Sequence, residues 1–147
     1  MNPETATGVA ASDRGLIGDD PRKLIYAEPR AAVSAELLLL EAGYDCLPRQ
    51  RLARGLVVDL VALTEPELLP VEVKLTDLPA IPAAMERAAR ERYRAVGRVL
   101  LVAYDTLGEP RGCVLMVGDS TARCDAEPAE LAALLASRGI VPEAAAD

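Results

Sequence analysis

The chain has 147 residues, a hydrophobic content of 51% and a formal net charge of −7. This length indicates one domain with a substantial buried core, although Phe and Trp are absent and the core must be built from Leu, Val and Ala. Because there is no histidine, the composition excludes triads with a histidine base and makes a zinc site improbable, which leaves carboxylates, lysine and a hard metal ion as the available chemistry.

The first predicted helix covers residues 29–43, since it begins with Pro29 and ends at Gly43. Arg30 and Glu41 share one side of this helix, which we expect to face solvent. Glu36 falls on the opposite, apolar side. We therefore expect Glu36 to point toward the sheet, an unusual position for a glutamate.

Three predicted strands follow, at residues 45–49, 56–63 and 70–74. Asp59 is the one ionisable residue in the apolar run 56–63, where an uncompensated carboxylate is costly. Glu72 and Lys74 are two residues apart and share one face of their strand. The segment between the last two strands is rich in turn formers, so we expect an antiparallel pair in which Asp59 and Glu72 approach each other.

The remaining predicted elements are a helix at 82–97, strands at 99–104 and 113–118, and a helix at 128–139. The helix at 82–97 is long enough for a right-handed crossover between parallel strands. The predicted fold is therefore α/β, a mixed five-stranded sheet flanked by helices in the order α-β-β-β-α-β-β-α.

The domain is expected to span residues 21–140, with a disordered or loosely attached segment at 1–20 and a flexible tail at 141–147. There is neither a signal-like start nor an apolar run of the roughly 18 residues that cross a bilayer, so we expect a cytoplasmic protein. The cysteines are three in number and widely spaced, which favours reduced thiols.

An inward glutamate on the first helix, an aspartate in an apolar strand and Glu-x-Lys in the next strand resemble the PD-(D/E)xK nuclease superfamily. The superfamily includes restriction endonucleases and Holliday-junction resolvases, and the resemblance covers residues 29–120. Val58 stands where the nominal proline would be, and the second helix offers Arg90 and Tyr93 where many members carry glutamine and tyrosine. The resemblance implies a restriction endonuclease-like fold.

The resemblance also implies a mechanism, hydrolysis of DNA phosphodiester bonds. Asp59 and Glu72, with the Val73 carbonyl, would hold Mg²⁺ or Mn²⁺, and Glu36 would assist through water. Lys74 would position the attacking water and offset charge in the transition state. The catalytic set is thus Glu36, Asp59, Glu72 and Lys74.

A structural interpretation of the same residues stays open. Asp59 could pair with an arginine such as Arg49 or Arg54, and Glu72 with Lys74 could form a pair on a solvated face. Function has alternatives as well: a catalytically inactive interaction module with a protein partner, or a phosphodiesterase acting on RNA or small nucleotides. A homodimer is implied by the resemblance alone.

The negative net charge disfavours binding to nucleic acid. The excess negative charge, however, lies in the two terminal segments of the chain. Residues 1–20 carry four acids and one base (−3), residues 119–147 carry six acids and two bases (−4), and residues 21–118 carry 13 of each and are neutral. Within the neutral part, Arg49, Arg51 and Arg54 precede the Asp59 strand, where binding of phosphates and a role in the turn are equally favoured. Arg90 is a further candidate for nucleic-acid binding.

Overall fold

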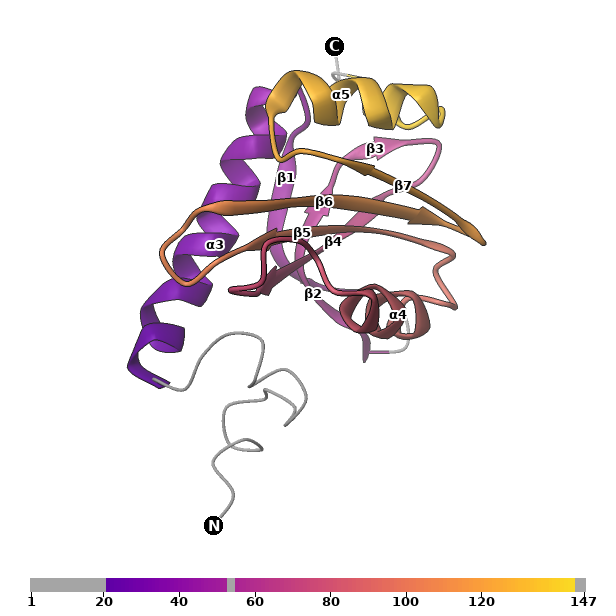
Figure 1. Ribbon diagram of the computed structural model, residues 1–147. Coiled ribbons are helices and arrows are strands. Elements are labelled where there is room, and N and C mark those ends of the chain that lie inside the picture. Colours follow the sequence, from indigo (N-terminus) through magenta and orange to yellow (C-terminus); the bar gives the residue numbers. More distant parts are fainter. Residues whose placement is uncertain (1–20, 53–54, 145–147) are drawn as a thin grey trace.

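The computed structural model describes residues 21–52 and 55–144, and these form three helices and eight strands (Figure 1). The helices are α3 (Pro21–Glu41), α4 (Ala83–Arg92) and α5 (Pro128–Ser137). The strands are β1 (Cys46–Arg51), β2 (Val57–Ala62), β3 (Thr64–Glu65), β4 (Leu69–Leu75), β5 (Arg98–Tyr104), β6 (Pro110–Val117), β7 (Ser120–Cys124) and β8 (Val141–Pro142).

Six strands form one mixed sheet in the order β1-β2-β4-β5-β6-β7, and β3 pairs with β8 in a small separate sheet. The predicted antiparallel pairing of the Asp59 strand with the Glu-x-Lys strand is confirmed, with Leu60 opposite Val71. The predicted parallel pair is also confirmed, because β4 and β5 run in the same direction and α4 lies in the connection between them. The other neighbouring strands of the large sheet are antiparallel.

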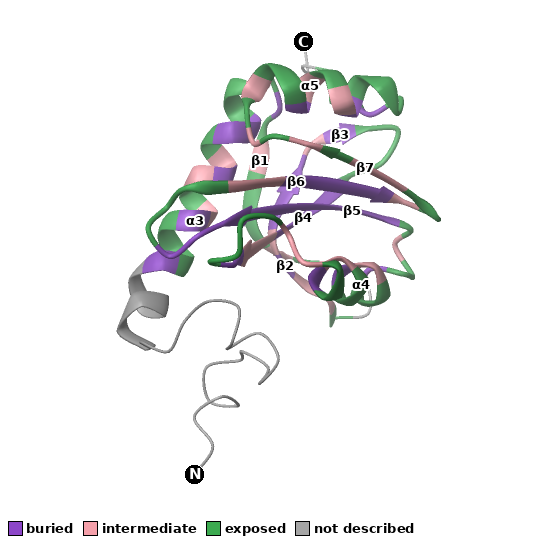
Figure 2. Cartoon of the chain, in the orientation of Figure 1, coloured by how far each residue is buried: buried purple, intermediate pink, exposed green. Residues whose placement is uncertain are grey.

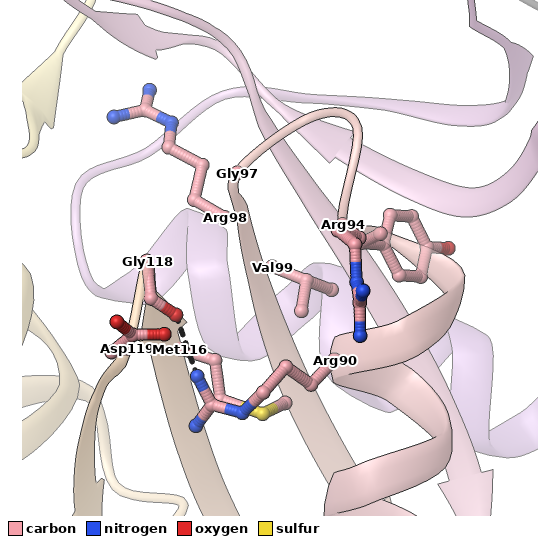
Figure 3. Close-up of a pocket in the computed structure, with 9 residues that line it drawn as sticks. Arg90, Arg94, Gly97, Arg98, Val99, Met116, Gly118 and Asp119 are labelled. Carbon is pink, nitrogen blue, oxygen red and sulfur yellow. Dashed lines mark hydrogen bonds between the residues drawn. The ribbon is translucent and has the colours of Figure 1, made fainter.

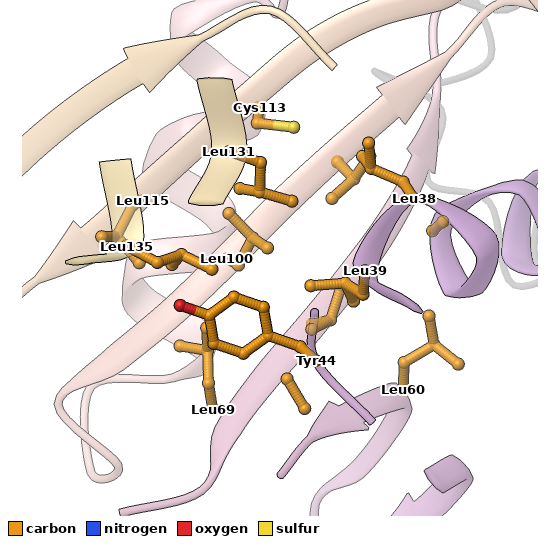
Figure 4. Close-up of a cluster of buried hydrophobic side chains, with 14 of the residues drawn as sticks. Leu38, Leu39, Tyr44, Leu60, Leu69, Leu100, Cys113, Leu115, Leu131 and Leu135 are labelled. Atoms are coloured by element: carbon orange, nitrogen blue, oxygen red, sulfur yellow. The ribbon is translucent and has the colours of Figure 1, made fainter. Parts of the chain in front are cut away.

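Helices cover both faces of the large sheet, with α3 and α5 on one side and α4 on the other (Figure 1). Under α3 and α5, leucines from helices and strands form the larger core cluster (Figure 4). The hydroxyl of Tyr44 donates a 2.9 Å hydrogen bond to the Ile140 carbonyl. A smaller cluster under α4 contains Met85, Ala89 and Tyr93. The central strands β4 and β5 are accordingly buried along most of their length (Figure 2).

The prediction of five strands was wrong, because the large sheet has six and the small sheet adds two. The strand of the large sheet that was not predicted is β7, whose sequence Ser-Thr-Ala-Arg-Cys lacks a run of large apolar residues. It lies at the edge of the sheet, beside β6 and in contact with α5, so only part of it is covered. A strand in that position needs little of the apolar alternation that identifies a strand in a sequence.

The predicted start of the first helix was also wrong. The helix α3 begins at Pro21, and Pro29 lies inside it. A proline in a helix interior lacks one hydrogen-bond donor and crowds the preceding turn, which is why Pro29 indicates a helix start in the sequence. As a consequence, Glu28 is a helical residue.

The second helix is shorter than predicted. It ends at Arg92, and the backbone N–H groups of Val96 and Gly97 then turn back to the Tyr93 carbonyl before β5 begins at Arg98. The third helix, α5, ends within two residues of its predicted end.

The predicted tail is partly structured, since Val141 and Pro142 pair with β3 and the Glu143 N–H donates to the Leu63 carbonyl. The predicted loose segment at 1–20 and residues 145–147 of the predicted tail lie outside the described residues. Across the described part of the chain, no helix combines the length and apolarity required to span a membrane.

Candidate functional site

Asp59 lies where the pairing of β2 with β4 stops. The last paired residues are Leu60 and Val71, and Asp59 is the next residue of β2. Its Oδ2 accepts a 2.8 Å hydrogen bond from the backbone N–H of Val73, which takes the place of a ladder bond. This contact holds the partly buried carboxylate beside the segment that carries Glu72 and Lys74.

Glu72 is almost completely buried, with 6% of its surface exposed. One carboxylate oxygen, Oε1, accepts a 2.8 Å hydrogen bond from the Tyr93 hydroxyl. The other, Oε2, lies 3.6 Å from Lys74 Nζ and 3.8 Å from Arg92 Nε. The buried charge is thus compensated by one hydroxyl and two cations, as a buried carboxylate requires.

The end of α4 organises these contacts. Arg92 donates from Nη2 to the Val57 carbonyl on β2 at 2.7 Å, and its guanidinium carbon lies 5.7 Å from the centre of the Tyr93 ring. Burial, followed by the charge of Glu72, raises the pKa of Tyr93 well above its ordinary value. Tyr93 therefore remains a proton-bearing donor to Glu72 over the whole physiological pH range.

The helix carboxylate that acts on this cluster is Glu28. Partial burial and the charge of Asp59 raise the pKa of Glu28, and the charge of Lys74 opposes that increase. Two carboxylates from α3 and β2 therefore repel each other across the site, with the ammonium group of Lys74 in range of both Glu28 and Glu72. Such a gathering of acids around one lysine, at the point where two strands separate, is the candidate functional site.

Glu36, the predicted helix carboxylate, occupies a different place. It is half-buried, and its charge acts on Cys46 of β1, whose pKa is raised to about 12 by burial and by Glu36 and Asp45. Glu36 follows Glu28 by eight residues, which corresponds to about 12 Å along the helix axis. The structure therefore brings Asp59, Glu72 and Lys74 together without Glu36, and Glu28 is the α3 carboxylate whose pKa responds to Asp59 and Lys74.

The predicted nucleic-acid-binding arginines fall into two groups. Arg49 and Arg51 are exposed on β1, the edge strand beside β2, while Arg54 lies outside the described residues. The pairing of Gln50 with Val58 and of the neighbouring residues places Arg49 across from Asp59. Arg49 has a φ of 37°, a left-handed conformation that is uncommon for a residue other than glycine.

Arg90 points away from the carboxylates. It donates to the Gly118 carbonyl at 2.6 Å (Figure 3). It also donates to the Thr121 hydroxyl, and both acceptors lie on the β6–β7 hairpin. Together with Arg94 and Arg98 it lines a cavity of about 410 Å³ that contains none of the candidate site's carboxylates. The arginine of α4 that reaches Glu72 is instead Arg92.

The capacity of the site for a metal ion rests on oxygen donors from two strands. Among the described residues, no three or more Asp, Glu, Cys or His side chains are grouped closely enough to hold a metal ion. Asp59 and Glu72 are nevertheless held on adjacent strands, and Glu28 adds a third carboxylate within electrostatic range of Asp59. Carboxylate oxygens are the ligands that Mg²⁺ and Mn²⁺ prefer, and Mg²⁺ commonly uses only one or two of them together with water.

Sequence reasoning missed two residues of this site. Glu28 was hidden because Pro29 marked an apparent helix start just after it. Arg92 lies among several arginines of α4, and only its contacts with Val57 and Glu72 distinguish it.

Comparisons of this chain with protein-family models, with curated proteins and with solved structures found no match. The resemblance to PD-(D/E)xK nucleases therefore depends on the residues of the site itself. Any assignment of activity has to be argued from their arrangement.

Proposed function

We propose that the chain is a metal-dependent nuclease with a restriction endonuclease-like fold that hydrolyses DNA phosphodiester bonds. The observation that carries this proposal is the convergence of Asp59, Glu72 and Lys74 where β2 and β4 separate, with Glu28 of α3 nearby. A lysine beside several carboxylates, in a chain without histidine, suits phosphoryl chemistry based on a hard cation.

The charge balance of the site supports a cation. Burial, followed by the charge of Asp59, raises the pKa of Glu28 despite the opposing charge of Lys74, and a bound cation would favour the ionised carboxylates. Asp59 and Glu72, with the Val73 carbonyl, would hold Mg²⁺ or Mn²⁺, and Glu28 would contribute through water. When bound, the ion would stabilise the negative charge that develops on the phosphate and lower the pKa of a coordinated water.

The protein groups have separate tasks. Lys74 is partly exposed, so its ammonium group would meet a phosphate oxygen or the attacking water while keeping its contact with Glu72. Tyr93 and Arg92 fix the orientation of the Glu72 carboxylate and act as positioning residues. Arg49 and Arg51 on the neighbouring edge strand would contact the DNA backbone.

Isosteric variants test the proposal. Asp59→Asn, Glu72→Gln and Lys74→Met should each lower Mg²⁺- or Mn²⁺-dependent cleavage of DNA by about 100-fold or more, because each removes a charge needed in the transition state. Cleavage of plasmid and of labelled linear DNA is the measurement, with circular dichroism to verify folding. Unchanged cleavage by all three variants would end the nuclease proposal.

Two glutamates of α3 provide a matched pair of variants. Glu28→Gln should reduce cleavage and weaken the metal dependence, whereas Glu36→Gln should leave both unchanged because Glu36 lies near Cys46. The opposite order would show that the helix glutamate predicted from the sequence, and not Glu28, serves the site.

A second candidate function is a non-catalytic interaction module on the same fold. It is favoured by the state of Glu72, whose two oxygens already contact Tyr93, Lys74 and Arg92. This candidate predicts no heat of Mn²⁺ binding in calorimetry and no turnover of DNA, RNA or cyclic nucleotides assayed side by side. Saturable Mn²⁺ binding that Asp59→Asn abolishes would exclude it.

A further inference from the structure

The β6–β7 hairpin carries two cysteines directly opposite each other. Cys113 of β6 pairs with Cys124 of β7 in the antiparallel register. Opposite residues of an antiparallel pair share one face of the sheet and have Cα atoms about 4.5–5.5 Å apart. Disulfide-linked cysteines have Cα atoms about 4.4–6.8 Å apart, so the backbone already meets the main distance requirement.

Both thiols lie on the face of the sheet that packs against α3 and α5. Cys113 is buried in the larger core cluster, close to Leu131 of α5 in Figure 4, and Cys124 packs against the same cluster while remaining partly exposed. A cavity of about 380 Å³ is lined by both cysteines and by Arg111, Arg123 and Glu130. Cys124, the partly exposed cysteine of the pair, is therefore the thiol that a small reagent can approach first.

From this geometry we infer that Cys113 and Cys124 form a reversible oxidation site, in which a peroxide converts the facing thiols into a disulfide that joins β6 to the edge strand β7. The site is independent of the carboxylate cluster and of the proposed nuclease activity. The sequence alone predicts only that the three cysteines are reduced thiols. Oxidation to a disulfide would give two of them a role.

The oxidation has two balanced steps. The Cys124 sulfur attacks hydrogen peroxide, so that a sulfur–oxygen bond forms, the oxygen–oxygen bond breaks and the departing hydroxide leaves as water with the thiol proton. The Cys113 sulfur then attacks the Cys124 sulfur, the sulfur–sulfur bond forms and the hydroxyl group leaves as a second water. Two thiols lose two electrons in total, and one hydrogen peroxide gains them.

The order of attack follows from the two thiols' surroundings. A hydrogen bond from Cys113 stabilises the Cys124 thiolate and lowers the pKa of Cys124, whereas the same bond together with burial raises the pKa of Cys113. Cys124 is also the more exposed of the two. The third cysteine, Cys46, has its pKa raised to about 12 and serves as an internal control of low reactivity.

The test uses the full chain treated with hydrogen peroxide and followed by thiol titration and intact mass. We expect two of the three thiols to disappear with a mass loss of about 2 Da, and dithiothreitol to restore both. Peptide mapping without reduction should join the Cys113 peptide to the Cys124 peptide. In Cys113→Ser, where no second thiol resolves the intermediate, dimedone should label Cys124.

The Cys46→Ser variant keeps the test decisive if a change in the hairpin prevents folding, because Cys113 and Cys124 are then the only thiols left. Loss of both thiols within a single chain supports the inference. Persistence of both thiols under conditions that oxidise Cys46 in the unmodified chain, or a product linked only between chains, overturns it.

Discussion

Asp59 shows how one side chain serves two purposes. Its carboxylate completes the backbone hydrogen bonding of β4 through Val73 and also supplies a charge to the candidate site. A structural hydrogen bond was one of the alternatives that the sequence left open for Asp59, although the partner foreseen was an arginine. The two purposes are separable because asparagine retains an accepting oxygen and loses the charge.

We predict that Asp59→Ala lowers the free energy of unfolding by about 1–3 kcal/mol, because it leaves the Val73 N–H without its acceptor. Asp59→Asn should cost less than about 1 kcal/mol. Urea unfolding of both variants is the measurement. Equal losses in the two variants would show that the charge, and not the hydrogen bond, stabilises the fold.

The raised pKa of Glu28 predicts that the free energy of unfolding depends on pH. Its pKa is raised in the folded chain, so the folded state favours the protonated form, and stability from this group is present at low pH and is lost as the pH rises through its folded pKa. Glu28→Gln removes the ionisable group, so the variant does not lose this stability as the pH rises. The variant should therefore gain free energy of unfolding over the unmodified chain at pH 7 but not at about pH 4. A gain that is the same at both pH values would show that the ionisation of Glu28, disfavoured by burial and by the charge of Asp59, does not cause it.

The residues that sequence analysis identified are those whose chemistry conflicts with their surroundings. An acid inside an apolar strand, as at Asp59, is conspicuous in the sequence. Glu28 lies on a more exposed part of α3, so its role depends on which side chains approach it in space. For the same reason no sequence pattern distinguishes Arg92 from the other arginines of α4.

At the scale of elements, the central strands were predicted well and the boundaries of helices poorly. Strands β4 and β5 are buried along most of their length and appear as apolar runs, whereas β7 is an edge strand with little apolar signal. The end of α4 was misplaced because its last predicted turn consists of residues that turn back toward β5. Arg98, the residue after the predicted helix, is buried at the start of β5 and donates to the carbonyls of Glu67 and Leu68.

Replacement of Pro29 tests directly where the helix α3 begins. If the helix continues through Pro29, replacement by alanine restores a helical N–H and relieves crowding. Pro29→Ala should then raise the free energy of unfolding by about 1–3 kcal/mol and increase helicity. Circular dichroism and urea unfolding are the measurements. No increase in either would indicate that the stable part of the helix begins at Pro29, as the sequence suggested.

At the scale of the whole molecule, charge is segregated along the chain. The neutral stretch 21–118 contains the candidate site, whereas residues 1–20 have a net charge of −3. Phosphates are repelled by that acidic segment at low ionic strength, where screening is weak.

Deletion of residues 1–20 should therefore strengthen DNA binding at low salt and have a smaller effect at about 0.5 M salt. Fluorescence anisotropy with a labelled duplex at two salt concentrations measures the difference. Equal affinities for the two proteins at low salt would show that the acidic segment does not influence the proposed binding of DNA.

The order of Glu72 and its contact residues along the chain has a consequence for synthesis on the ribosome. Tyr93 and Arg92 follow Glu72 by 21 and 20 residues, and β5, the parallel neighbour of β4, comes later still. The β2–β4 hairpin therefore leaves the exit tunnel with its acid solvated, and the carboxylate is withdrawn from water only after α4 has emerged. Burial of this charge is a late event in the maturation of the nascent chain.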